Sequence, residues 1–208
     1  TAYRRQRQMC IRDRGTALNL PAVTAEDEKL LEATVSFASL VEVSFVRTAQ
    51  DMRDAVAMVR RVEQRSGRNV GIVVKLETLE SMQNLPDILL ELMKHERVGV
   101  MVARGDMAAE LGIMHMVEAP RYVVNLCQAA QLPVIIGSNI LETLTDAGQP
   151  TRAEVTDAAW AQQAECVMLN HGKHMVETVE AVGALLSAMD GVQRKNQSLL
   201  PSLHEWKR

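Results

Sequence analysis

The sequence predicts an α/β protein built on part of a parallel (β/α)8 barrel, with about five βα units. Two observations support this class. Short apolar runs rich in β-branched residues alternate with longer segments of helical periodicity, as expected for buried parallel strands joined by crossover helices. Charged and hydroxyl-bearing residues directly follow several of these runs, at the point where a barrel strand ends and active sites are built.

Composition limits the function classes. The chain has 208 residues, of which 47% are hydrophobic, enough for one domain with a sizeable core. With 23 Lys and Arg against 26 Asp and Glu, the net charge of -3 gives no electrostatic case for nucleic acid or a membrane surface. No apolar run reaches the roughly 18 residues of a membrane helix, and no secretory segment is recognised. Three widely spaced cysteines favour a reducing, cytoplasmic location over a disulfide framework.

The first elements are predicted from local signals. Thr24 resembles an N-cap followed by an acidic first turn, so a helix is expected over residues 25–37. A strand is expected over residues 40–46. Apolar residues recur on one face of residues 50–64, which predicts an amphipathic helix, and Gly67 is expected to help end it.

The alternation then repeats to the end of the domain. Strands are expected over residues 70–75 and 98–103, with a helix over 85–95 that has Pro86 in its first turn. A capping box at Thr151 opens a later helix. The remaining expected elements are a helix over 117–130, a strand over 133–137, a helix over 151–163, a strand over 166–169 and a helix over 177–189.

Two strand ends carry the residues best suited to chemistry. Lys75 and Glu77 are two apart at the end of one strand, so their side chains lie on the same side. The next strand breaks at Arg104-Gly-Asp106, where a glycine permits close backbone approach to a ligand and a helix is expected to start. Free backbone N–H groups beside a carboxylate suit a divalent metal and an anionic substrate in one site.

Three motifs in register resemble pyruvate kinase: Lys75-Leu-Glu77, Ala103-Arg-Gly-Asp106 and Pro150-Thr-Arg-Ala-Glu154. The resemblance runs from about Gly15 to about Val182. It implies phosphoryl transfer between phosphoenolpyruvate and ADP, giving pyruvate and ATP in glycolysis. It also implies Mg²⁺ or Mn²⁺, K⁺ held by residues absent from this chain, and a homo-oligomeric full-length parent.

The resemblance assigns roles to the two strand ends. Glu77 and Asp106 are the implied metal ligands, since two carboxylates from adjacent barrel strands can converge on one Mg²⁺. Lys75 is the implied catalytic cation, which neutralises charge on the transferring phosphoryl group and on the enolate. Lys75 also counts among the implied substrate-binding residues.

A substrate seat and a proton relay complete the implied site. Arg104, Gly105 and Asp106 form the seat, in which backbone N–H groups bind the carboxylate of phosphoenolpyruvate. Ser138 stands where the family has the Thr of an Ala-Thr-Gln segment, so it is expected both to bind substrate and to relay a proton toward the enolate carbon. Serine keeps the hydroxyl but lacks the methyl group that restricts the threonine rotamer.

Departures from the family pattern keep other readings open. After the last strand the family has Ser-Gly-Glu-Thr, whereas this chain has Asn170-His-Gly-Lys173. A non-catalytic pyruvate-kinase-like protein that binds a carboxylate ligand or a partner is therefore one alternative. A metal-dependent pyruvate-enolate aldolase or lyase on a related barrel is another, although it leaves the motif at residues 150–154 unexplained.

The expected domain organisation has three parts. Residues 1–14 carry five arginines without apolar periodicity and are expected to be a disordered or non-native segment. Residues 15–192 form the partial barrel domain, and residues 193–208 form a polar tail. Because five strands cannot close an eight-stranded barrel, and the family's lid and regulatory domains are expected to be missing, the isolated chain is expected to be inactive.

Overall fold

The computed structural model describes residues 20–190. The predictions for residues 1–14 and 193–208 fall outside the described residues. Within the described range, no helix is both long enough and apolar enough to cross a membrane.

The centre of the fold is a parallel sheet in which the strands follow one another in chain order. Each neighbouring pair is parallel, and the order is β1-β2-β3-β4-β5. The strands are β1 (Leu40–Val43), β2 (Gly71–Leu76), β3 (Val98–Ala103), β4 (Val134–Gly137) and β5 (Cys166–Val167). Sequential parallel pairing is the order of strands in a (β/α)8 barrel, so the predicted α/β class and the part-barrel are confirmed.

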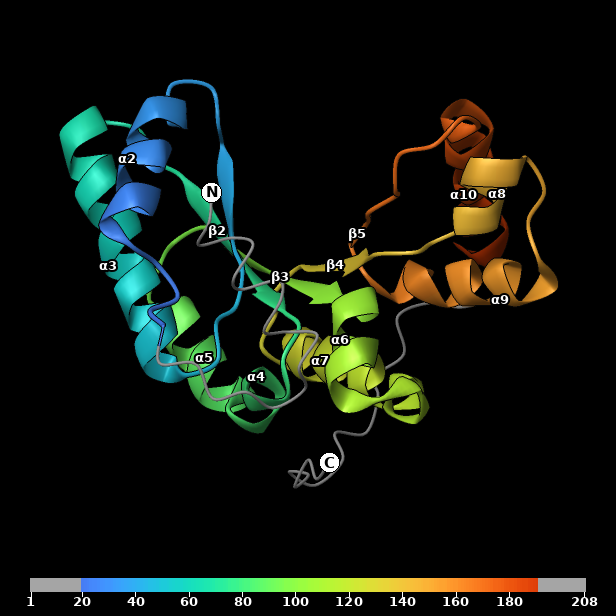
Figure 1. Ribbon diagram of the computed structural model, residues 1–208, viewed down its shortest axis with the longest axis horizontal. Coiled ribbons are helices and arrows are strands. Elements are labelled where there is room, and N and C mark those ends of the chain that lie inside the picture. Colours follow the sequence, from blue (N-terminus) through green and yellow to red (C-terminus); the bar gives the residue numbers. More distant parts are fainter. Residues whose placement is uncertain (1–19, 191–208) are drawn as a thin grey trace.

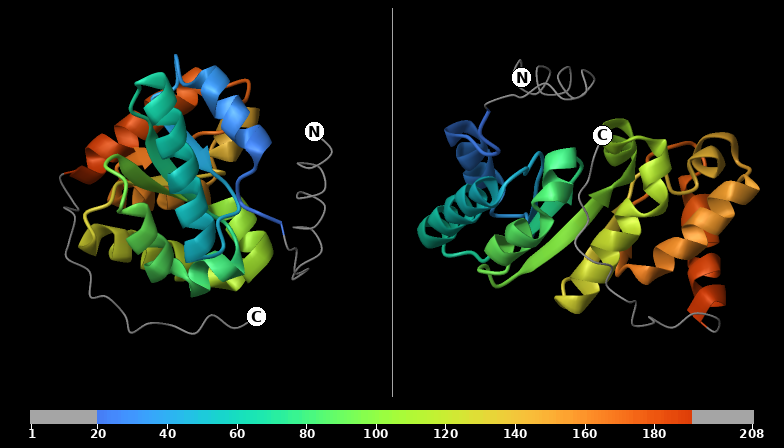
Figure 2. Two further views of the ribbon diagram at one scale, coloured as in Figure 1. Left: turned by 90° about the vertical axis from the view of Figure 1, so that its left-hand side faces the viewer. Right: turned by 90° about the horizontal axis from the view of Figure 1, so that it is seen from below.

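Helices precede and follow the strands in regular alternation. The α-helices are α2 (Ala25–Thr34), α3 (Ala49–Ser66), α4 (Leu79–Gln83), α5 (Leu85–Leu92), α6 (Arg104–Leu111), α7 (Ala119–Ala129), α8 (Glu142–Ala147), α9 (Arg152–Trp160) and α10 (Met175–Asp190). Two 3-10 segments, η1 (Ile113–Val117) and η2 (Ala161–Gln163), extend this set. Figure 1 places α2 and α3 at one end of the row of strands and α8 and α10 at the other. The right-hand view of Figure 2 separates the first and last units in the same way.

One face of the sheet supplies the hydrophobic core. On β2 the alternate residues Ile72, Val74 and Leu76 are fully buried and belong to the core cluster, together with Val100 and Val102 of β3. The helices α3, α5 and α7 contribute their apolar stripes to the same cluster. Because side chains alternate along a strand, the opposite face of β2 carries the intervening residues, among them Lys75.

Local capping signals in the sequence hold in the structure. The hydroxyls of Thr24 and Thr151 each accept a hydrogen bond from the backbone N–H of the third helical residue, which is Asp27 or Glu154. The carboxylates of Asp27 and Glu154 in turn accept a hydrogen bond from the backbone N–H of the capping threonine. Gly67 ends α3 with φ of 69°, a left-handed conformation that glycine adopts without steric cost.

The differences from prediction lie in short elements and boundaries. The strand at residues 98–103 has the predicted bounds, whereas β1 and β5 are shorter than predicted. The helices α4 and α8 were not predicted, because segments of five and six residues are too short to display a hydrophobic stripe. They lie in the segments that follow β2 and β4, next to the residues expected to carry chemistry.

Candidate active site

Sheet pairing brings the predicted motifs to one edge. In the β2–β3 pair Lys75 lies opposite Met101, and in the β3–β4 pair Ala103 lies opposite Gly137. Residues 77, 104–106 and 138 therefore leave neighbouring strands at the same carboxyl edge. This edge is where barrel proteins assemble their active sites.

Lys75 joins the two predicted carboxylates. Its Nζ donates to Oε2 of Glu77 at 2.6 Å and to Oδ2 of Asp106 at 2.9 Å. The Lys75 side chain is 18% exposed, Glu77 is almost completely buried and Asp106 is about half exposed. The carboxylates of Glu77 and Asp106, which follow two adjacent strands, thus meet at the Lys75 ammonium. Solvent reaches this group from the Asp106 side.

Burial and charge act in opposite directions on this group. Burial raises the pKa of the Glu77 carboxyl, and the result stays above its usual range although Lys75 and the Phe45 N–H lower it. Burial lowers the pKa of the Lys75 ammonium, but the two carboxylates outweigh this, so the net pKa lies above its usual value. Lys75 therefore carries its charge through the whole neutral pH range.

A backbone contact fixes the orientation of Glu77. Its Oε1 accepts a hydrogen bond of 2.7 Å from the Phe45 N–H, in the segment that follows β1. Phe45 has φ of 60°, an uncommon backbone conformation for a bulky residue, and such conformations often occur at functional sites. Oε2 consequently faces Lys75, while Oε1 is used for anchoring.

The helix α6 starts inside the predicted motif. Its N-cap is Ala103, and no side chain caps its first turn. An uncapped helix start presents backbone N–H groups and a partial positive charge, which together favour an anion. Asp106 lies in this first turn, so the potential anion seat and a carboxylate are adjacent.

Arg104 connects three segments of the site. Its Nη1 donates to both carboxylate oxygens of Asp157 on α9 at 2.6 Å, and its Nη2 donates to the Ser138 carbonyl oxygen at 2.9 Å. The Arg104 side chain is only 12% exposed. The guanidinium thus braces α6 against α9 and the segment after β4, and the prediction that Arg104 contacts substrate stays a prediction.

Ser138 begins a chain of side-chain hydrogen bonds. Its hydroxyl donates to Oδ1 of Asn139 at 2.7 Å, and Nδ2 of Asn139 donates to Oε2 of Glu142. Oε1 of Glu142 accepts from Nδ2 of Asn170 at 3.4 Å. Gly105 lies beside this chain, since a Cβ there would be 3.0 Å from the Ser138 hydroxyl oxygen.

Several of these partners were missed by sequence reasoning. Asp157 lies 53 residues after Arg104, and nothing local to either residue signals the pairing. The Phe45 N–H is a backbone donor and has no side-chain signature. Asn139 and Glu142 fall in and just after the segment that departs from the family pattern, and that departure was the one available signal.

Comparison with known proteins decides the family. A family model described as pyruvate kinase, barrel domain, matches residues 5–179. The chain belongs to the pyruvate kinase family. It is 35% identical over 173 residues to a pyruvate kinase of Leishmania mexicana and to pyruvate kinase 1 of Trypanosoma brucei brucei, matches that cover 80% of this chain and 33% of each relative. A pyruvate kinase of Kluyveromyces lactis is 36% identical over 159 residues, covering 75% of this chain and 30% of the relative. The chain thus spans about a third of the length of these curated relatives.

Pyruvate kinases typically use Mg²⁺ and K⁺, and the donor set at the carboxyl edge fits a divalent cation. Glu77 and Asp106 offer hard carboxylate oxygens on either side of a position already taken by a cationic nitrogen. Among residues 20–190, no group of three or more His, Cys, Asp or Glu side chains gathers as a metal site. The two carboxylates would hold Mg²⁺ with water and substrate oxygens in the remaining positions, the usual arrangement for this ion.

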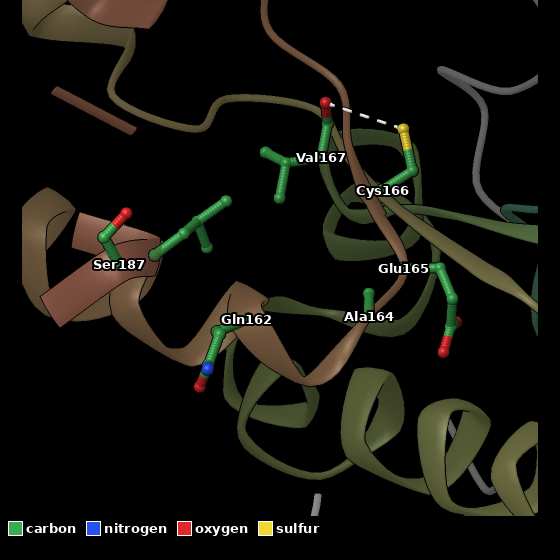
Figure 3. A pocket seen from close by; sticks show the side chains of 7 residues that line it. Gln162, Ala164, Glu165, Cys166, Val167 and Ser187 are labelled. Carbon is green, nitrogen blue, oxygen red and sulfur yellow. Dashed lines mark hydrogen bonds between the residues drawn. The ribbon is translucent and has the colours of Figure 1, made fainter. Parts of the chain in front are cut away.

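Two hollows of the described chain lie away from this pyruvate kinase edge. One, of about 340 Å³, is lined by residues around the start of β5, including Cys166, and by Leu186 and Ser187 of α10 (Figure 3). The other, of about 270 Å³, is lined by polar residues next to the starts of β2 and β3, including Asn69, His95 and Arg97. Both lie at the amino ends of strands, and neither includes Lys75, Glu77 or Asp106.

Proposed function

We propose that this chain carries the phosphoryl-transfer part of a pyruvate kinase, which moves a phosphoryl group between phosphoenolpyruvate and ADP. The observation that carries the proposal is the bridge from Lys75 to Glu77 and Asp106 at the carboxyl edge of two adjacent strands. A cation and two convergent carboxylates beside an uncapped helix start suit a phosphorylated carboxylic acid held with a divalent metal.

Lys75 acts on the transferring phosphoryl group. Its ammonium is partly buried, its pKa is raised by the two carboxylates, and it lies between them. Bound Mg²⁺ would supply Lewis-acid stabilisation of the phosphoryl and enolate oxygens. Lys75 would add a fixed positive charge where negative charge develops, which lowers the barrier more than it strengthens ground-state binding.

The start of α6 and Ser138 would handle the remainder of the substrate. The N–H groups of Gly105 and Asp106 would bind the substrate carboxylate, and the absence of a capping side chain leaves this turn open to an anion. Arg104 would contact the substrate as well, and its bonds to Asp157 and to the Ser138 carbonyl oxygen would hold its guanidinium and this turn in place. Ser138 would lie beside the reacting carbon, since its hydroxyl oxygen is next to Gly105.

The proposed cofactors and partners follow from the family. They are Mg²⁺ or Mn²⁺ on Glu77 and Asp106, K⁺ on groups not assigned in this chain, and ADP or ATP as the second substrate. A cytoplasmic location and a homo-oligomeric parent complete the proposal. The isolated chain is proposed to be inactive, because β1 and β5 are open edges and the described strands do not close into a barrel.

A chimera tests the function directly. Residues 15–182 replace the matching third of the Leishmania mexicana pyruvate kinase, and a coupled assay measures pyruvate formed from phosphoenolpyruvate with ADP, Mg²⁺ and K⁺. The chimera should turn over, and Lys75→Met should lower its kcat roughly 10³-fold with little change in KM. A chimera in which Lys75→Met raises KM but leaves kcat unchanged would contradict the proposed role. Lys29→Met, at an exposed lysine of α2 away from the site, is the matched control and should keep kcat within about two-fold.

A non-catalytic carboxylate-binding protein is the second candidate. The observation that favours it is the departure at the ends of β4 and β5, where Gly137-Ser-Asn139 and Asn170-His-Gly-Lys173 replace the usual family patterns. A correctly folded chimera that binds phosphoenolpyruvate with Mg²⁺ but forms no pyruvate would support this second function.

A further inference from the structure

The orientation of the Ser138 hydroxyl is set by groups that the proposed function does not use. The Ser138 hydroxyl has one proton, and it donates that proton to Oδ1 of Asn139 at 2.7 Å. With its proton in that bond, the hydroxyl oxygen offers only lone pairs to other neighbours. Gly105, at the start of α6, lies beside both oxygens of this bond, since a Cβ there would be 3.0 Å from the Ser138 hydroxyl oxygen and 3.1 Å from Oδ1 of Asn139.

The carboxylate of Glu142 determines which way the Asn139 amide faces. An ionised carboxylate can only accept hydrogen bonds, so the Asn139 group bound to it must be the NH₂ group. The carbonyl oxygen of the same amide is then turned to Ser138. If the amide were reversed, two oxygen acceptors would face each other at Glu142.

Glu142 is itself held from the far side. Its Oε1 accepts from Nδ2 of Asn170 at 3.4 Å, in the loop that follows β5. The backbone supports the same arrangement, since Asn139 has φ of 63°, a left-handed conformation that asparagine tolerates better than most residues. Asn139 and Asn170, one from each segment that departs from the family pattern, therefore take part in one hydrogen-bond chain that ends at Ser138.

We propose that Glu142, acting through Asn139, is a positioning residue that makes Ser138 present an oxygen lone pair, and not a proton, to the ligand seat beside Gly105. The assignment of that seat to a carboxylate ligand rests on the proposed function. The ligand class that fits a lone pair here is one with an acidic C–H or O–H group, such as the methyl group of pyruvate. An anionic oxygen at the same position would gain nothing from Ser138.

The first test concerns the chain without any ligand. The 208-residue chain is labelled with ¹⁵N-asparagine, and the Asn139 side-chain NH₂ signal is identified by its loss in Asn139→Gly. Glu142→Gln should shift this signal and speed its exchange with water, because a charge-assisted hydrogen bond is lost. Glu180→Gln, an exposed residue of α10, is the matched control and should leave the signal unchanged. An Asn139 signal that Glu142→Gln does not alter would overturn the proposal.

The second test uses oxalate with Mg²⁺ as a probe, because oxalate places an anionic oxygen next to a carboxylate. As a single substitution, Ser138→Ala should not weaken oxalate binding measured by calorimetry, since the wild-type Ser138 hydroxyl offers no proton to the ligand. Asn139→Gly frees the hydroxyl and keeps the charge of Glu142, so it should tighten binding about ten-fold, the typical gain from one hydrogen bond to a charged group. Adding Ser138→Ala to Asn139→Gly should abolish that gain.

The two tests separate two kinds of failure. Weaker oxalate binding in Ser138→Ala alone, or no change in Asn139→Gly, would overturn the proposed hydroxyl orientation. If no variant binds oxalate while Glu142→Gln still alters the Asn139 signal, the assignment of the seat fails and the orienting role of Glu142 is supported. Circular dichroism and thermal unfolding of each variant check that the fold is kept.

Discussion

The ends of β2 and β3 differ from the ends of β4 and β5 in the kind of polar group they carry. At the first pair, Lys75 joins Glu77 and Asp106, and Glu77 is 1% exposed. At the second pair, Ser138, Asn139 and Glu142 form an exposed chain of mostly neutral groups. Removing the partner of a buried charge costs several kcal/mol of stability, whereas replacing an exposed amide or hydroxyl costs little, because water takes over its hydrogen bonds.

This difference matches where the chain follows its family and where it departs from it. The family-like residues Lys75, Glu77 and Asp106 form the charged half, in which Glu77 is buried and Asp106 is about half exposed. The departures, Gly137-Ser-Asn139 and Asn170-His-Gly-Lys173, lie in the polar half, where all of these residues except Gly137 are exposed or half-buried. The comparison indicates that a substitution in the charged half can leave a buried carboxylate without its partner, whereas a substitution in the polar half cannot.

The largest expected effect is the loss of Lys75. Lys75→Met leaves the buried Glu77 carboxylate without its ion-pair partner, so the free energy of unfolding at pH 7 should fall by about 3 kcal/mol. Urea unfolding followed by circular dichroism measures this change. The double variant Lys75→Met, Glu77→Gln should recover much of the loss because no buried charge remains. If Lys75→Met lowered the free energy of unfolding no more than the exposed Lys173→Met does, the Lys75 ion pair would be solvated and not buried.

The next effect is on the pH dependence of stability. Burial raises the folded-state pKa of Glu77 above its ordinary value of 4.5. Between 4.5 and the raised value the folded state binds more protons than the unfolded state, so this group lowers stability as pH rises. The stability of Glu77→Gln relative to wild type should therefore increase upward from pH 4.5, with a slope of at most about 1.4 kcal/mol per pH unit. A difference that stays constant from pH 4 to 8 would mean that the pKa of Glu77 is not raised.

A smaller effect is expected at the brace between the two halves. Asp157→Asn removes the carboxylate that binds the guanidinium of Arg104, and Asp157 is 40% exposed, so water can replace part of the bond. The free energy of unfolding should fall by about 1 kcal/mol. Asp146→Asn on α8, also exposed, is the matched control and should change stability by less than about 0.5 kcal/mol. Equal effects of the two variants would show that Arg104 does not depend on Asp157.

The smallest effect is expected in the exposed polar half. Ser138→Thr restores the residue type of the family and keeps the hydroxyl, so the free energy of unfolding should change by less than about 0.5 kcal/mol in thermal melts. The same substitution limits the rotation of the side chain. A loss above about 2 kcal/mol would contradict the view that this half is loosely constrained.

The parts of the fold that could be predicted are those with local signals. The strand at residues 98–103 has the predicted bounds because a β-branched apolar run is bounded by polar residues. The capping box at Thr151 was predicted because its signal lies within four residues. The helices α4 and α8 were missed since they have no room for periodicity.

The sequence predicts which residues belong to the candidate site, but the contacts among them depend on the fold. The spacing of Lys75 and Glu77 placed them on one side of a strand, but their meeting with Asp106 depends on which strands pair. The bond from the Phe45 N–H to Glu77 depends on a backbone conformation with φ of 60°. Pairings such as Arg104 with Asp157 join segments far apart in the chain, so they follow from the fold and not from local pattern.

Binding of Mn²⁺ to the 208-residue chain tests most directly whether Glu77 and Asp106 together form one site for a divalent cation. Water proton relaxation measures the affinity in wild type, in Glu77→Gln, in Asp106→Asn and in the control Glu180→Gln. Each of the two site variants should weaken Mn²⁺ binding at least about ten-fold, since each removes one of two protein ligands, and the control should bind as wild type does. Wild-type affinity in both Glu77→Gln and Asp106→Asn, or no Mn²⁺ bound to the wild-type chain, would contradict the account.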